Sequence, residues 1–222
     1  NQLDVTNSGT ISVPPGNPYY PVNALGINAY VNGSGIGTVP KGSFTKLTNT
    51  AAGTINGTAY VSTTAEALTI DNVGTINGNL IGDQTSLYTY LPASPGFSGG
   101  YFPVDQLSAS ITNSGAINGS LSLSSSAATA SIANSGTVAA NQNGGAVQAL
   151  VETNDGTTLK LTNSGTISNA ASGGQAIVAG ARTGFSFPDN GAAATLEVVN
   201  TGSLSANGGA LLYSCCLYDY ST

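Results

Sequence analysis

The sequence predicts an all-β fold, a right-handed parallel β-helix (β-solenoid) with about 21 residues per turn. Three observations predict it. A seven-residue phrase, apolar-x-Asn-x-Gly-small-apolar, recurs from one end of the chain to the other. Apolar and polar residues alternate within each copy, as they do in a half-buried strand. The motif glycines of neighbouring copies are 21 residues apart in two cases, and 41 and 44 apart in two others.

Six copies of the phrase are regular, and a seventh carries two extra residues between its Asn and its Gly. A repeat of this kind indicates one structural unit stacked on copies of itself. The regular copies read VTNSGTI (5–11), IDNVGTI (70–76), ITNSGAI (111–117), IANSGTV (132–138), LTNSGTI (161–167) and VVNTGSL (198–204), and the longer one is LTNTAAGTI (47–55).

Alternation within a copy predicts which side chains face inward. Around residues 159–162 the two leucines should point into the core, whereas Lys160 and Thr162 should point to solvent. The Asn-x-Gly that follows should form a corner, with the glycine at positive φ. A second strand then leaves in a new direction with Ile167 inward.

The glycine spacing distinguishes a coil from other repeat folds. A step of 21 residues suits one turn of two or three short strands, whereas a propeller blade needs about 40 to 45. We therefore expect eight to ten turns, on the order of 40 to 50 Å of rod at about 4.8 Å per turn. The steps of 41 and 44 should contain a degenerate turn or carry insertions. Gly-Gly or Ile-Asn-Gly sequences after six of the seven copies indicate a second corner that leads into another inward-facing strand.

Stacked copies would place their asparagines above one another. We expect an inward ladder of amide hydrogen bonds from turn to turn, the alternative being that each Asn caps only its own turn. The predicted ladder residues are Asn7, Asn72, Asn113, Asn134, Asn163 and Asn200.

The runs NSGTI and GTING, with GGxA strands between them, resemble the β-helical passenger domains of Gram-negative autotransporter and filamentous-haemagglutinin-type surface proteins. The resemblance implies a secreted or cell-surface rod of a Gram-negative bacterium, often adhesive, and carries over no catalytic residue. The chain starts at Asn1 without a leader, which suits a mature secreted product. It departs from the autotransporter pattern in its short length and in lacking a segment like the C-terminal membrane barrel.

Composition argues against several classes of function. Charged residues make up 6% of the chain, the net charge is −6, and His is absent. Four scattered cations do not suit nucleic-acid binding, and without His the commonest general base and metal ligand is missing. Asp4, Asp71 and Glu197 should face outward without forming a cluster. We expect no enzyme activity, no catalytic, cofactor-binding or metal-binding residues, no cofactor and no transmembrane segment.

We expect one β-solenoid domain over 1–222, with insertions near 13–46, 83–105 and 180–192. All nine prolines lie outside the motif copies, as expected if the copies are paired strands. The insertions are rich in aromatic residues, which either pack on the rod or form a contact surface. Together with the C-terminal segment 207–222 they supply the predicted assembly or ligand contacts: Tyr19, Tyr20, Tyr88, Tyr90, Tyr101, Phe102, Leu211, Tyr213 and Tyr218.

Both ends of the predicted rod lack a polar cap. Leu3 and Val5 begin the first copy almost at the N-terminus, and the C-terminal segment is apolar. Uncapped strand edges template further pairing, so we expect copies to stack head to tail into a filament. The alternatives are a piece of a longer rod, and an adhesin passenger that binds surface or glycan ligands through its aromatic loops. Cys215 and Cys216 are adjacent and could form a strained bridge, bond to other subunits or stay reduced.

A last alternative is binding to ice or another flat lattice. An outward threonine row should run along the second strand of each turn, interrupted by Ala116 and Ser203. A threonine row is also simply a good solvent-facing strand surface. The row comprises Thr10, Thr54, Thr75, Thr137 and Thr166.

Overall fold

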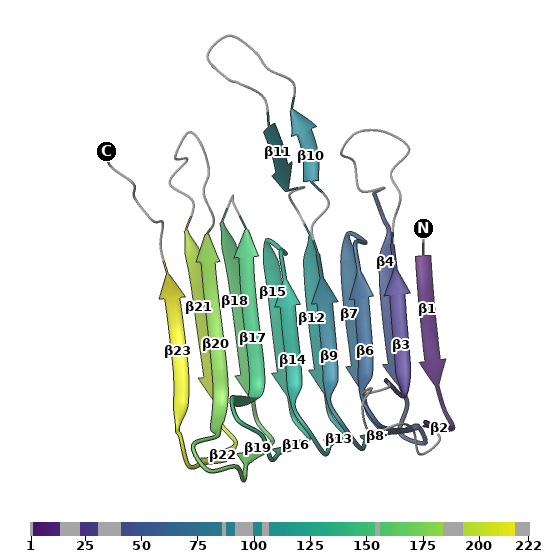
Figure 1. The fold of residues 1–222 in the computed structure, drawn as a ribbon, viewed down its shortest axis with the longest axis vertical. Coiled ribbons are helices and arrows are strands. Elements are labelled where there is room, and N and C mark those ends of the chain that lie inside the picture. Colours follow the sequence, from purple (N-terminus) through teal and green to yellow (C-terminus); the bar gives the residue numbers. More distant parts are fainter. Residues whose placement is uncertain are drawn as a thin grey trace.

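The computed structural model describes residues 2–13, 23–30, 41–85, 88–91, 100–103, 107–153, 156–183 and 193–215. The described strands form three parallel sheets of seven strands each, and every sheet extends along the whole stack of turns (Figure 1). Each turn of chain contributes one strand to every sheet, and the strands lie in register with those of the turns before and after. No helix occurs among the described residues. The predicted parallel β-helix is confirmed.

We name the sheets A, B and C in the order in which the chain visits them. Sheet A contains β1 (Gln2–Asn7), β4 (Phe44–Asn49), β7 (Ala67–Asn72), β12 (Ser108–Asn113), β15 (Thr129–Asn134), β18 (Thr157–Asn163) and β21 (Ala194–Asn200). Sheet B contains β2 (Thr10–Ser12), β5 (Thr54–Asn56), β8 (Thr75–Ile76), β13 (Ala116–Ile117), β16 (Thr137–Ala140), β19 (Thr166–Asn169) and β22 (Ser203–Ala206). Sheet C contains β3 (Leu25–Ala29), β6 (Ala59–Thr63), β9 (Leu80–Gln84), β14 (Leu121–Ser125), β17 (Gly145–Thr153), β20 (Gln175–Thr183) and β23 (Ala210–Cys215).

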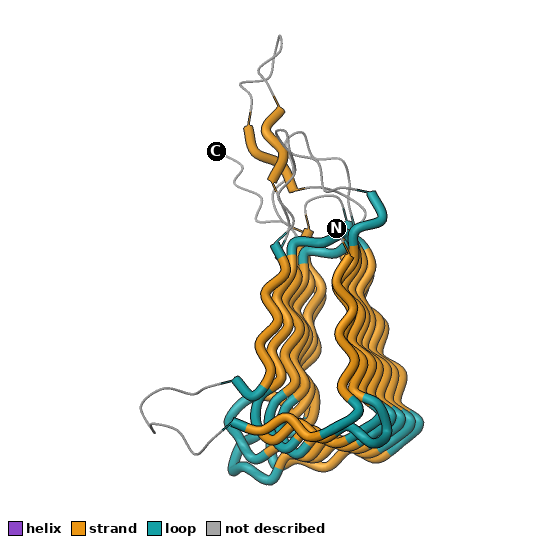
Figure 2. Tube along the Cα trace, turned by 90° about the vertical axis from the view of Figure 1, so that its right-hand side faces the viewer, coloured by secondary structure: helices purple, strands orange, loops and turns teal. Residues whose placement is uncertain are grey.

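The described residues form seven turns rather than the predicted eight to ten. The long glycine steps carry insertions and contain no degenerate turn, because the strands on either side of each step pair directly. In the 41-residue step between Gly74 and Gly115, an antiparallel hairpin of β10 (Tyr88–Leu91) and β11 (Gly100–Pro103) follows β9. The hairpin lies beyond the strand ends of sheets A and C, and not at either end of the stack (Figures 1 and 2). Seven turns at about 4.8 Å each span about 29 Å between the first and last strands.

The core is a set of apolar columns enclosed by the three sheets. Viewed along the stack, the strands of successive turns superimpose, with sheets A and C facing each other and sheet B closing one side (Figure 2). Leu159 and Leu161 are buried while Lys160 points outward, as the alternation predicted. Leu161 belongs to a column of fully buried residues paired in register: Leu47, Ile70, Ile111, Ile132 and Leu161.

The motif glycines are required for a different reason from the predicted one. Positive φ angles occur at other glycines, such as Gly57 (133°) and Gly144 (96°) at the second corner. The motif corners instead stack so closely that a Cβ atom would overlap the carbonyl oxygen of the motif glycine one turn earlier, at Gly74, Gly115, Gly136, Gly165 and Gly202. Gly9, in the first turn, has nothing within 4 Å of its ideal Cβ position.

The insertions are narrower than predicted. The region 13–46 contains β3 and the start of β4, which are regular strands of the coil. β20 extends to Thr183, inside the insertion expected at 180–192, and residues 210–215 of the expected C-terminal segment form a regular strand of sheet C. β3 was missed because it follows no Gly-Gly or Ile-Asn-Gly corner and carries no Asn-x-Gly phrase. Strands after the Gly-Gly corners at 173–174 and 208–209 were expected, and only their lengths were not.

Candidate assembly interface

The motif asparagines form a continuous hydrogen-bonded ladder inside the corner between sheets A and B. In each turn the side-chain Nδ2 donates to the Oδ1 of the asparagine in the next turn, at 2.7 to 2.8 Å. The ladder contains the six predicted residues and also Asn49, in the copy with two extra residues. Its order is Asn7, Asn49, Asn72, Asn113, Asn134, Asn163 and Asn200.

The motif asparagines make the ladder bonds between turns and also the capping contacts within their own turns. Asn72, for example, donates from Nδ2 to Asn113 at 2.7 Å and lies 3.4 Å from the carbonyl oxygen of Gly74 in its own corner. The ladder bond is the shorter of the two. Since the interior members are almost completely buried, each amide depends on its neighbours for hydrogen bonds.

The ladder has a direction. Every amide donates toward the C-terminal end of the stack and accepts from the N-terminal side. At the first turn, the Oδ1 of Asn7 accepts a bond from the Gly9 N–H at 3.2 Å within its own corner. At the last turn, the Nδ2 of Asn200 donates to the Gly202 carbonyl at 3.2 Å and is exposed. One end of the stack therefore presents an acceptor, and the other presents a donor.

A second, exposed ladder runs along sheet B in the opposite direction. Asn118 donates to Asn77 at 2.8 Å, Asn77 to Asn56 at 2.8 Å, and Asn56 to the hydroxyl of Ser12 at 2.9 Å. These asparagines belong to the Ile-Asn-Gly sequences. Water can replace hydrogen bonds at an exposed site, so this ladder should contribute less to stability than the buried one.

The N-terminal face of the stack exposes core residues. Leu3 is 37% exposed, although it occupies the inward column of Leu68 and Leu159, which are almost fully buried in the interior turns. Val5 and Ile11 are only partly buried for the same reason. Among the described residues, β1, β2 and β3 each pair with a strand on one side only. This face is therefore an apolar patch bordered by strand edges.

The C-terminal face has the same character. Leu204 is 37% exposed and Leu212 is 47% exposed, although both occupy inward columns. Leu196 and Val198 are partly exposed on the same face. Within the described part of the chain, β21, β22 and β23 also pair on one side only. Exposed apolar surface next to unpaired strand edges is typical of an interaction site.

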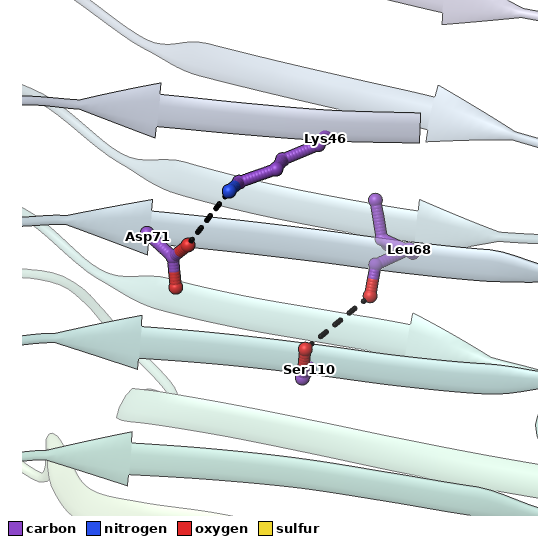
Figure 3. A network of polar contacts seen from close by, with 4 residues as sticks. All are labelled: Lys46, Leu68, Asp71 and Ser110. Atoms are coloured by element: carbon purple, nitrogen blue, oxygen red, sulfur yellow. Dashed lines mark hydrogen bonds and ion pairs between the residues drawn. The ribbon is translucent and has the colours of Figure 1, made fainter. Parts of the chain in front are cut away.

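Charged side chains lie on the outer surfaces of the sheets as ion pairs between neighbouring turns. Lys160 Nζ is 2.9 Å from Glu197 Oε1, and Lys46 Nζ is 3.8 Å from Asp71 Oδ2 (Figure 3). Close by, the hydroxyl of Ser110 donates to the Leu68 carbonyl at 3.5 Å. The charged side chains are one third to one half exposed, so each pair should contribute less than about 1 kcal/mol. Asp71 and Glu197 do not form a cluster, as predicted.

Several predicted contact residues lie outside the described residues, namely Tyr19, Tyr20, Tyr218 and Cys216. Tyr88, Tyr90, Tyr101 and Phe102 lie in the β10–β11 hairpin, and Leu211, Tyr213 and Cys215 lie in β23, where the backbone is described. Their roles in assembly or ligand binding, and the state of the cysteines, stay predictions.

The threonine row is present on the outer face of sheet B. Its members pair in register from Thr10 to Thr166, with Ala116 and Ser203 at the predicted interruptions. Within the described parts of the chain, no three residues of the His, Cys, Asp and Glu types gather as a metal site. The same parts contain no helix long and apolar enough to cross a membrane.

Comparisons of the chain with protein-family models, with curated proteins and with solved structures found no match. Function must therefore be inferred from the two end faces of the stack and from the ladder that connects them.

Proposed function

We propose that this chain is the structural subunit of an extracellular or cell-surface filament, a homopolymer built by head-to-tail stacking of β-helical rods. The observation that carries the proposal is the complementarity of the two end faces. In the part of the chain that the structure describes, each face presents three parallel strand edges without a partner strand, next to exposed core residues. If the last turn of one copy stacks on the first turn of the next, the junction repeats the geometry found between turns inside the chain.

Stacking in register would bury apolar residues against apolar residues in each inward column. Burial of apolar surface is the main favourable term in association, at roughly 25 cal/mol per Å². The columns follow from the strand pairing of the first and last turns. They would pair Leu196 with Leu3, Val198 with Val5, Leu204 with Ile11, and Leu212 with Ile27. Ile27 is already buried within the subunit, so the gain in burial in the last column would come from Leu212.

The direction of the ladder supports head-to-tail stacking over a symmetric dimer. The exposed Asn200 amide could donate to the Oδ1 of Asn7 in the next copy, as Asn163 donates to Asn200 within the chain. Two N-terminal faces would instead bring two acceptors together. A contact between unlike faces does not close on itself, and it therefore generates a filament.

The extracellular setting is also part of the proposal. It is supported by the low content of charged residues and by the resemblance of the NSGTI and GTING runs to the β-helical passengers of Gram-negative surface proteins.

Gly9→Ala tests the junction without disturbing the subunit. In the isolated chain nothing lies within 4 Å of the added methyl group, so the variant should fold with the same urea midpoint as the original. In a stacked pair, Gly9 would occupy the position that Gly202 has above Gly165, where a Cβ overlaps a carbonyl oxygen. We expect the concentration needed for assembly, measured by sedimentation, to rise at least about tenfold.

Gly26→Ala is the matched control, because Gly26 is exposed in the same first turn and also has free space around its Cβ position. Gly26 points outward in β3, so this variant should assemble like the original chain. The proposed register is wrong if Gly9→Ala assembles equally well. The filament proposal itself is wrong if the original chain stays monomeric at every concentration. That result would favour the alternative that the chain is a piece of a longer rod, whose further turns would cover the end faces.

A further inference from the structure

Building on the head-to-tail function above, we propose that acidity strengthens the junction, because stacking in register brings the carboxylates of Glu197 and Asp4 side by side. Both residues belong to the same outward column of sheet A. Glu197 pairs in register with Lys160 on β18, and Asp4 pairs with Lys46 on β4. The column at the junction would therefore read Lys160, Glu197, then Asp4 and Lys46 of the next copy.

Within the subunit each carboxylate of this column has a lysine opposite it on the neighbouring strand. The Lys160 ammonium lies 2.9 Å from Glu197. Lys46 lies opposite Asp4 and 3.8 Å from Asp71. The outward residues beside the two carboxylates on their own strands are uncharged: Thr195 and Val199 on β21, and Gln2 and Thr6 on β1. The two carboxylates would thus meet only when copies stack.

The balance of charges across the junction follows from the column spacing. The two carboxylates would lie one turn apart, about 4.8 Å, while each faces the other copy's lysine at about twice that distance. Coulomb energy falls inversely with distance, so the two attractions together roughly cancel the repulsion between the carboxylates. The repulsion between the two lysines remains, which leaves the junction slightly repulsive.

One proton changes the sign of this balance. Protonation of either carboxylate removes the carboxylate–carboxylate repulsion and one of the two attractions. The other carboxylate still attracts the lysine across the junction, and this attraction exceeds the repulsion between the two lysines, which lie farther apart. A protonated carboxyl group can also donate a hydrogen bond to the facing carboxylate. The stacked pair therefore binds a proton more tightly than the separated ends do, and by linkage a fall in pH favours stacking.

The test compares critical concentrations for assembly at pH 7.5 and pH 5.0, measured by sedimentation of the purified chain. The concentration for the original chain should fall about three- to tenfold between the two conditions. Asp4→Asn and Glu197→Gln should each lower it by a similar factor at pH 7.5 and should largely remove the response to pH.

Asp83→Asn is the matched control for net charge. Asp83 lies on β9 in the middle of the rod, where it accepts a hydrogen bond from the Tyr60 hydroxyl at 3.2 Å. This variant should keep the full pH response. The acid effect at the junction is wrong if Asp4→Asn and Glu197→Gln respond to pH as the original chain does, or if Asp83→Asn loses the response equally. If neither the original chain nor any variant assembles at either pH, the filament proposal itself is wrong.

Discussion

Gly136→Ala is expected to prevent folding of the central turns or to destabilise them by about 3 kcal/mol or more. The added Cβ would overlap the carbonyl oxygen of Gly115 in the turn before. That oxygen is fixed, because it accepts the backbone hydrogen bond of Thr137 at 2.9 Å. A backbone atom held in this way cannot move aside as a flexible side chain could. Circular dichroism with urea unfolding would measure the loss.

Gly9→Ala is the control for this substitution, since it makes the same change at the same motif position in the first described turn, where nothing lies within 4 Å of the ideal Cβ position. At concentrations below assembly it should leave the urea midpoint unchanged. Equal destabilisation by the two variants would show that the glycine is required by its own turn and not by stacking. No change in either variant would contradict the close approach of the corners.

Asn113→Ala is expected to destabilise the chain by about 2–4 kcal/mol. Asn113 is fully buried, accepts from Asn72 and donates to Asn134, with both ladder bonds at 2.7 Å. Truncation removes both bonds and leaves a buried donor and a buried acceptor without these partners. The cost should therefore exceed that of one ordinary hydrogen bond. Urea unfolding, followed at two wavelengths to detect partial opening of the stack, would measure it.

Asn118→Ala is the matched control, five residues along in the same turn. Asn118 is exposed and makes one 2.8 Å bond to Asn77 in the outer ladder. Water can solvate the group that is left, so the expected change is within about 0.5 kcal/mol. If both variants cost the same, the buried ladder would have no special role in stability.

The sequence alone was sufficient to predict the coil and the inward or outward direction of its residues. Alternation placed Leu159 and Leu161 inside, and the spacing of Gly53 and Gly74 predicted one turn per 21 residues. These features depend on the periodicity of residues along the chain, and a single sequence is enough to show that periodicity. Asn49 was missed as a ladder member because two extra residues separate it from its glycine, although its strand pairs in register with Asn7 and Asn72.

The reason for the motif glycines could not be predicted from one turn. Considered alone, an Asn-x-Gly corner suggests positive φ. Close contact with the turn before appears only when the turns are stacked, and the first turn differs from the rest for that reason. β3 was missed for a related reason. Its residues Leu25–Ala29 lie within the region expected as an insertion and lack the motif, and the strand is defined by its pairing with β6.

The description of the end faces depends on both the sequence and the stacking of the turns. The sequence indicated that the first and last repeats are apolar, and the structure adds the register in which they match. Leu3 and Leu212 occupy columns whose interior members are buried, yet they are 37% and 47% exposed. The ladder adds direction, with an acceptor at Asn7 and a donor at Asn200.

The axial repeat of assembled material tests the central proposal most directly. Electron microscopy of the purified chain at high concentration should show uniform unbranched fibres with strong diffraction at about 4.8 Å along the axis. Seven turns per subunit should add a longer axial repeat of about 34 Å. Monodisperse single rods under the same conditions, or fibres whose strands run parallel to the axis, would contradict head-to-tail stacking.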